Sequence, residues 1–258
     1  MNVLIIYAHP EPKSLNGAIL NTLKQQLGLA QHRVKVSDLY ELNWKSEVSR
    51  KDFVGFNKET RLKVPEASGT ATADGTLSRD VIKEQEKLMW ADTVIFLFPL
   101  WWYSMPAILK GWFDRVYSYG FAYGVGEHSD TKWGERFGEG KLQGKKAMLI
   151  VTAGGWKEHY SSMGINGSMD DLLFPINHNM LFYPGFDVLP SLVFYQADRT
   201  NESDFKVIEQ TIVERIDTLA TTQPIAYRKQ NFGDYTIPHM QLLPDLVNGK
   251  QGFNIHIE

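Results

Sequence analysis

The chain has 258 residues, of which 43% are hydrophobic and 22% are charged, and its formal net charge is -3 at pH 7. This composition is typical of a globular protein, and the near-neutral charge argues against a broad nucleic-acid-binding face. The absence of cysteine excludes disulfides, thiolate nucleophiles and cysteine-ligated metals. The longest apolar stretch, residues 93–109, contains two prolines and is shorter than the roughly 20 residues of a membrane-spanning helix. We therefore expect a cytoplasmic protein with no membrane insertion and no nucleic-acid partner.

Apolar runs, helix caps and turn signals alternate along the chain, and they predict strands that are each followed by a helix. The predicted strands cover residues 1–7, 33–39, 93–98, 146–152 and 187–195, and Pro190 breaks the last of them. The predicted helices cover residues 14–30, 78–90, 106–117, 170–181 and 202–219. Residues 40–76 and 120–144 carry many turn-forming or charged residues and predict long loops.

This alternation predicts an α/β fold with a doubly wound, five-stranded parallel sheet in the strand order 2-1-3-4-5. Residues 1–222 form this domain. The hydrophobic periodicity fades in residues 223–258, which predicts an irregular C-terminal extension that packs on the pocket or on a dimer seam. Ligands of such sheets bind beyond the carboxyl ends of the strands. The loops at 8–17, 99–106 and 152–167 are therefore the candidate site.

The loop after the first strand carries several hydrogen-bond donors. His9, Lys13, Ser14 and Asn16 lie before or within the first turn of a predicted helix, whose N-terminus attracts phosphate. The loop lacks both the G-x-G-x-x-G pattern of a dinucleotide fold and the Gly-Lys-Ser/Thr of a P-loop. It is either a phosphate-binding loop of another kind or an ordinary capped turn.

The loop after the third strand contains three consecutive aromatic residues, Trp101, Trp102 and Tyr103. Pro99 and Pro106 restrict the backbone on both sides of them. Flat, rigid side chains support a planar cofactor by stacking, so this loop predicts a planar ligand. The alternative is that the rings belong to the core, as we expect for at least one of them.

The loop after the fourth strand contains paired glycines, Gly154 and Gly155, followed by Tyr160. Glycine lets backbone N–H groups approach a ligand closely, and such groups stabilise negative charge. The Tyr160 hydroxyl is able to donate a hydrogen bond or to relay a proton. Alternatively, the glycines serve only the turns of a surface loop.

Other candidate residues indicate structure rather than chemistry. The seven histidines show no metal-ligand spacing, so we expect no metal site. The charged segment at residues 83–87 has the pattern of a solvated helix face. Asp114 and Arg115, at the end of a predicted helix, are expected to have a structural role as an ion pair.

Together and in this order, the three loops resemble those of the NAD(P)H:quinone oxidoreductase family, the DT-diaphorase type of flavodoxin-like flavoenzyme. The resemblance extends over residues 2–220, and its most specific motif is Pro-Ala-Ile-Leu-Lys-Gly-Trp-Phe at residues 106–113. The other matching residues include Ala8-His9, Ser14-Leu15-Asn16, Ser37-Asp38-Leu39-Tyr40, Phe98-Pro99-Leu100, Phe121-Ala122-Tyr123, Gly154-Gly155 and Tyr160.

The resemblance implies a flavodoxin-like homodimer that reduces quinones or related aromatic acceptors by two-electron, ping-pong hydride transfer. FAD is the expected cofactor, FMN is the less favoured alternative, and NADH or NADPH is the expected hydride donor. By family position the cofactor-binding residues are His9, Ser14, Leu15, Asn16, Leu100, Trp101, Trp102, Tyr103, Thr152, Ala153, Gly154, Gly155 and Tyr160. The implied catalytic residues are Gly154, Tyr160 and Asn166, and the implied substrate contacts are Trp102, Tyr103 and Tyr123.

Two departures from the family pattern bear on these roles. Asn166 stands where some members carry a histidine that is thought to join Tyr160 in proton relay. No basic contact to the adenosine end of FAD is clearly matched near Phe205 and Lys206, so FMN stays open. Two other functions also stay open. One is a flavin-binding regulatory subunit of a membrane potassium-efflux transporter, and the other is a one-electron carrier, which the long insertions disfavour.

Overall fold

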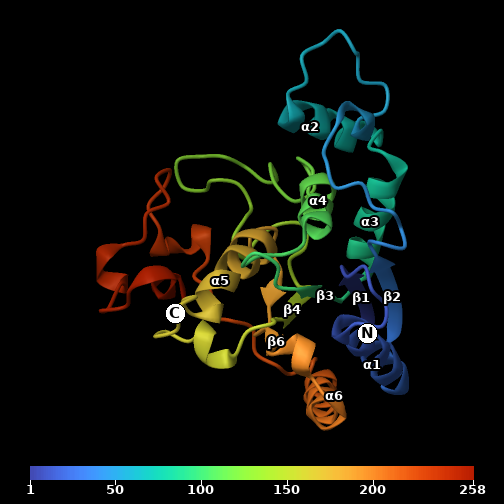
Figure 1. The fold of residues 1–258 in the computed structure, drawn as a ribbon. Coiled ribbons are helices and arrows are strands. Elements are labelled where there is room, and N and C mark those ends of the chain that lie inside the picture. Colours follow the sequence, from blue (N-terminus) through green and yellow to red (C-terminus); the bar gives the residue numbers. More distant parts are fainter.

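The computed structural model describes all 258 residues and contains one parallel β-sheet between two layers of helices (Figure 1). The strands follow the order β2-β1-β3-β4-β5, and β6 also pairs with β4. Their bounds are Asn2–Tyr7 (β1), Arg33–Asp38 (β2), Thr93–Pro99 (β3), Lys146–Thr152 (β4), Asp187–Val188 (β5) and Leu192–Phe194 (β6). The expected fold and strand order are confirmed. The expected break in the strand at 187–195 is also present: two short strands flank Pro190, which cannot donate a ladder hydrogen bond.

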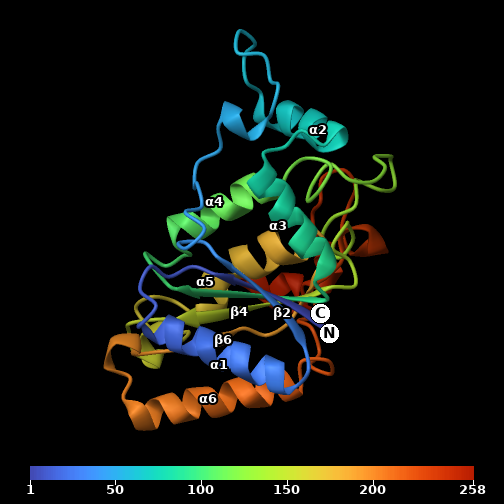
Figure 2. The same ribbon diagram turned by 90° about the vertical axis from the view of Figure 1, so that its right-hand side faces the viewer.

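Two helices cover one face of the sheet and three cover the other. α1 (Leu15–Leu29) and α6 (Glu202–Asp217) lie side by side below the sheet in Figure 2, and α3 (Arg79–Trp90), α4 (Ala107–Val116) and α5 (Met169–Ile176) lie above it. Successive side chains of β1 point to alternate faces. Val3 and Ile5 pack with α1 and α6, whereas Leu4 and Ile6 pack with the other helices. Burial on both faces explains the continuous apolar run of this strand.

The segment expected to be a long loop at 40–76 contains a helix, α2 (Val64–Asp74). Pro65 stands in its first turn, and Gly75 ends it in the left-handed conformation with φ 67°. Both are ordinary helix-boundary signals. Ala67 and Ala71, one helical turn apart, form its buried side. Because this apolar side consists of alanines, the segment has little helical hydrophobic pattern, and the expectation of a loop was wrong here.

The expectation of a solvated face at residues 83–87 holds for Lys83 and Glu86, which are exposed, but it is wrong for Glu84, which is only 2% exposed. Its carboxylate accepts a hydrogen bond from Nε1 of Trp112 at 2.9 Å and pairs with Lys87 at 2.6 Å. The Lys87 ammonium also donates to Ser37 Oγ at 2.8 Å. A buried indole N–H on α4 needs an acceptor, and α3 supplies one from its charged stretch.

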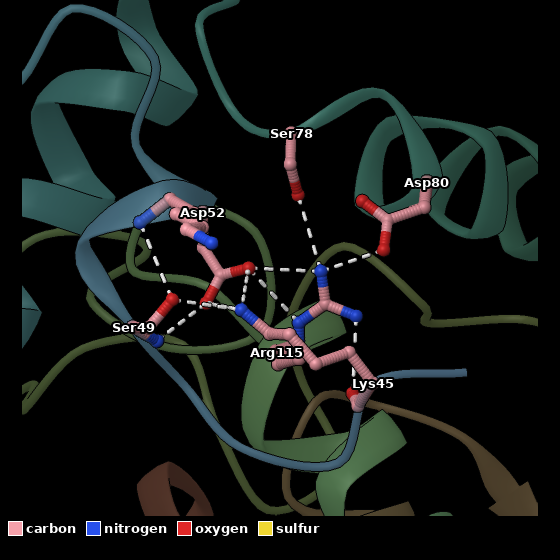
Figure 3. A network of polar contacts seen from close by, with 7 residues as sticks. Lys45, Ser49, Asp52, Ser78, Asp80 and Arg115 are labelled. Atoms are coloured by element: carbon pink, nitrogen blue, oxygen red, sulfur yellow. Dashed lines mark hydrogen bonds and ion pairs between the residues drawn. The ribbon is translucent and has the colours of Figure 1, made fainter. Parts of the chain in front are cut away.

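A buried network centred on Arg115 ties the 40–80 segment to α3 and α4 (Figure 3). The guanidinium donates to Asp52 Oδ1 at 2.8 Å and to Asp80 Oδ2 at 2.6 Å, and Lys45 pairs with Asp52 at 3.0 Å. Arg115 therefore forms structural ion pairs, as expected, but Asp114 and Arg115 do not pair with each other. Asp114 pairs instead with Lys110 on the surface, at 2.6 Å.

The irregular tail packs against the end of α5 through a column of aromatic rings. Phe253 of the tail stacks on Phe174 with ring centroids 4.3 Å apart, and Phe174 stacks on His178 at 4.6 Å. His178 in turn stacks on Phe137, in the long loop after α4, at 4.9 Å. Burial lowers the pKa of His178 to about 4, so this ring is neutral at pH 7. Packing of the tail on a dimer seam stays a prediction. None of the helices combines the length and apolar character needed to cross a membrane.

Replacing Arg115 by methionine leaves the buried Asp52 carboxylate with Lys45 as its only cationic partner. We expect the free energy of unfolding to fall by about 3–5 kcal/mol, the usual effect of breaking a buried ion pair. Urea denaturation followed by circular dichroism measures this change. Lys110→Met is the matched control, because exposed pairs such as Lys110–Asp114 contribute less than about 1 kcal/mol. A loss in Arg115→Met no larger than in the control would contradict the structural role of the network.

Candidate functional site

The parallel register brings three loops to one edge of the sheet. Tyr7 of β1 lies beside Leu97 of β3, and Pro99 of β3 lies beside Thr152 of β4. The pairing continues just past the strand ends, where Leu100 N–H donates to Thr152 O at 2.8 Å. The residues that follow β1, β3 and β4 are therefore neighbours in space, as expected for a doubly wound sheet.

The first loop presents backbone donors at the start of α1. Ser14 caps the helix by accepting from Gly17 N–H at 3.2 Å, while the N–H groups of Leu15 and Asn16 donate to no protein group. His9 Nδ1 accepts from Glu11 N–H at 3.0 Å, and burial lowers the pKa of His9. His9 therefore favours its neutral form, and its Nε2 has no partner within the chain and is able to meet a ligand. This group of donors suits a phosphate or a polar ligand edge.

Gly17 is required for this loop by close packing. A Cβ at Gly17 would lie 2.0 Å from the carbonyl oxygen of Pro12, a contact that side chains do not make. A side chain at this position would therefore displace the backbone that carries the free N–H groups of the first turn.

Asn16 links the first loop to the third. It is only 2% exposed, and its Nδ2 donates to Thr152 Oγ1 at 2.6 Å. Its Oδ1 is buried and has no partner within the chain. A buried carbonyl oxygen without a donor costs free energy, so a ligand hydroxyl or N–H at this point would be stabilising.

The second loop is a tight turn that presents its aromatic rings to the outside. Trp101 and Ser104 exchange backbone hydrogen bonds of 2.9 and 3.1 Å, and the two residues between them have positive φ, 48° for Trp102 and 61° for Tyr103. Glycine and asparagine adopt these φ angles readily, whereas any other residue type adopts them at a cost of order 1–3 kcal/mol. Trp102 is 94% exposed, so the turn is not held by burial of this ring. Trp101 is 42% exposed and Tyr103 is 50% exposed, so the expectation that at least one of these rings belongs to the core is wrong.

The third loop adds free N–H groups and a phenol. Neither Gly154 nor Gly155 donates its backbone N–H within the chain. A Cβ at Gly155 would lie 3.0 Å from Cε2 of Tyr160, so glycine allows the tyrosine to pack against the bend. Burial raises the pKa of Tyr160, and this phenol therefore keeps its proton at neutral pH. It lies beside Tyr195, with ring centroids 5.7 Å apart.

The structure brings most of the sequence-predicted site residues together on the three loops. The polar members with contacts across these loops are Asn16, Tyr103, Thr152 and Asn166. Tyr123 is the exception. It follows α4, whose ten residues span about 15 Å, and its ring contacts Tyr119. It therefore lies at the end of α4 away from the aromatic turn, and it does not reach the site of its own chain.

The start of α6 is the part of the site that the sequence left unresolved. A hollow of about 490 Å³ lies between the first turn of α1 and the first turns of α6. Lys13 and Leu15 line it on one side, and Phe205 and Lys206 line it on the other. In the sequence, the start of α6 is marked by the N-cap Asn201 before an amphipathic helix. Only the packing of α6 beside α1 shows that both helices begin at the same edge of the sheet.

The arrangement fits a flavin better than a metal. Free N–H groups from the first and third loops, the orphaned Asn16 oxygen and the exposed aromatic turn match the phosphate, polar ring edge and flat face of a flavin. No group of three or more His, Asp or Glu side chains is arranged to hold a metal ion.

Comparisons with known proteins agree with this geometry. The family model for the flavodoxin-like fold matches residues 1–217. A ribosyldihydronicotinamide dehydrogenase-like protein of Penicillium crustosum is 57% identical over 260 residues, covering 99% of this chain and 95% of the relative. NAD(P)H dehydrogenase (quinone) 1 of Rattus norvegicus is 35% identical, covering 97% of this chain and 89% of the relative. A solved structure assigned to a quinone reductase of Klebsiella pneumoniae is 57% identical, with a TM-score of 0.98 and 100% of both chains covered.

Gly17→Ala tests the role of the first loop. We expect it to weaken flavin binding at least tenfold, because the loop backbone must move away from the new Cβ. Fluorescence titration of the flavin-free protein with FAD measures this. Gly28→Ala, in the same helix with nothing within 4 Å of the new Cβ, should bind FAD normally. Equal affinities of the two variants would show that the first turn of α1 does not hold the ligand.

Proposed function

The chain belongs to the NAD(P)H:quinone oxidoreductase family of flavodoxin-like proteins and is an oxidoreductase, and from this premise we propose that it reduces quinones or related aromatic acceptors with a bound flavin. The convergence of free backbone donors beside the exposed aromatic turn carries the proposal. A bound flavin would supply the two-electron chemistry, which is hydride transfer from NADH or NADPH to an acceptor that also takes up a proton to become a hydroquinone.

The protein residues bind and orient the reactants and hold a proton. The first turn of α1 and His9 would hold the phosphate and ribityl part, and the buried Asn16 oxygen would accept from a ribityl hydroxyl. The rings of the aromatic turn would support the flat face. The N–H groups of Gly154 and Gly155 would stabilise negative charge on the polar edge. Tyr160, which keeps its proton at neutral pH, would donate there.

FAD is the better of the two flavins for this chain. The hollow of about 490 Å³ opens from the first turn of α1 toward α6, so a ligand bound by its first phosphate there has space to continue. Phe205 offers a flat ring to an adenine, and Lys13 and Lys206 offer charge to a pyrophosphate. FMN would leave this hollow unused. NADH, NADPH and ribosyldihydronicotinamide, which the Penicillium relative is named for, are the donors to compare.

We propose that the protein works as a homodimer. Trp102, Met163 and Ile165, which lie on the second and third loops of the site, are each more than 90% exposed. Exposed apolar side chains beside a site are candidates for a subunit interface. Tyr123 lies too far from the site of its own chain to act there. A second copy would cover these side chains and bring its own Tyr123 to the substrate pocket.

The purified protein tests the function directly. We expect a yellow protein that releases FAD on denaturation and that reduces a quinone with NADH or NADPH. Since donor and acceptor would occupy the same pocket in turn, double-reciprocal plots at several fixed acceptor concentrations should be parallel. Intersecting lines would exclude the shared pocket, and an isolated protein that binds flavin without turnover would favour the regulatory alternative.

Light scattering during gel filtration tests the dimer. The expected mass is twice the 29.5 kDa of the chain. Ile165→Glu should shift the mass toward that of one chain, because a charge would be buried in the interface. Leu29→Glu, which alters an exposed leucine at the far end of α1, should leave the mass unchanged. A single-chain mass for the unaltered protein, with full activity, would rule the dimer out as the working unit.

A further inference from the structure

The aromatic turn and the third loop are joined by one side-chain hydrogen bond. Tyr103 Oη donates to Asn166 Oδ1 at 3.1 Å, across 63 positions of sequence. This bond is made by a residue with a strained backbone, since Tyr103 has φ 61°. A turn of this kind aims its side chains in a fixed direction, and here it aims the phenol of Tyr103 at the carboxamide of Asn166.

The backbone of Asn166 is fixed next to Tyr160. Asn166 N–H donates to His159 O at 3.0 Å, so the loop folds back on the short helix Lys157–Tyr160. A Cβ at Gly164 would lie 2.3 Å from that same His159 oxygen, which leaves glycine as the residue that permits this fold-back. The backbone therefore places the Asn166 side chain beside the Tyr160 phenol, and only its carboxamide rotation is left to be set.

The bond from Tyr103 sets that rotation. Because Oδ1 of Asn166 accepts from Tyr103, the donor Nδ2 is turned to the other side of the carboxamide. Burial raises the pKa of Tyr160, and the side chain of Asn166 acts in the opposite direction, which agrees with its donor Nδ2 lying on the side of Tyr160.

We propose that Tyr103 is a positioning residue that orients the Asn166 carboxamide, so that Nδ2 supports the Tyr160 oxygen and leaves the Tyr160 proton free for the ligand. The inference rests on the proposed function for its catalytic meaning. When Tyr160 gives its proton to the flavin edge or to the acceptor oxygen, Nδ2 stabilises the resulting phenolate, and a proton from water restores the phenol. Asn166 thus supports proton transfer without titrating, which a histidine at this position would do.

Tyr103→Phe is the variant that tests this proposal, because it removes one hydroxyl and keeps the ring. We expect the proton-dependent step, followed by stopped-flow absorbance in the flavin-bound protein, to slow about three- to tenfold, with little change in the KM for the acceptor. The decisive comparison is a double-mutant cycle with Asn166→Leu. If Tyr103 acts through Asn166, Tyr103→Phe causes no further loss in the Asn166→Leu background. Tyr183→Phe, which removes a phenol whose ring contacts Phe137 away from the three loops, is the matched control and should leave the rate unchanged.

A second readout does not depend on turnover. In the ¹⁵N-labelled protein, the side-chain amide resonances of Asn166, assigned by their loss in Asn166→Leu, should broaden or average in Tyr103→Phe and stay sharp in Tyr183→Phe. Unchanged resonances, or additive rate losses in the cycle, would overturn the positioning role. If the unaltered protein reduces no acceptor at all, the proposed function fails, while the resonances still decide whether Tyr103 orients Asn166.

Discussion

The parallel pairing of β1, β3 and β4 is the constraint on which the candidate site depends. Its register sets Tyr7 beside Leu97 and Pro99 beside Thr152, so three loops from distant parts of the sequence begin at the same edge. The strands stay in register because both faces are buried, and a slip by one residue would exchange the two sets of core side chains. The hydrogen bond between Asn16 and Thr152 then locks the first loop to the third just above the sheet.

At this edge the chain departs from the conformations that its residues prefer. Trp102 and Tyr103 adopt a turn that suits small residues, and the buried Asn16 oxygen lacks a donor. Strain and unsatisfied groups of this kind concentrate at functional sites, where a ligand makes the missing contacts. The rest of the protein provides the stability that tolerates them, through the two core layers and the Arg115 network.

The sequence predicted the architecture well because the strands are buried on both faces and the helices on one. It predicted poorly where one residue's role depends on a distant partner. Glu84 has the local pattern of a surface residue, and only the position of Trp112 on α4 makes it a core acceptor. α2 was missed because its buried side is two alanines. Residue types and order were sufficient to suggest the three loops, but the bond between Tyr103 and Asn166 depends on backbone angles that no local pattern encodes.

The column of aromatic rings that holds the tail makes the stability of the folded chain depend on pH in the acid range. His178 stands between Phe174 and Phe137, and burial lowers its pKa to about 4 from an ordinary value of 6.5. A folded chain that binds this proton less readily than an unfolded one loses stability as the pH falls from near 6.5 to near 4. This cost falls on the packing of the tail against α5. At the sheet edge, His9 carries a cost of the same sign, because burial lowers its pKa too. Mild acid should therefore loosen the C-terminal segment.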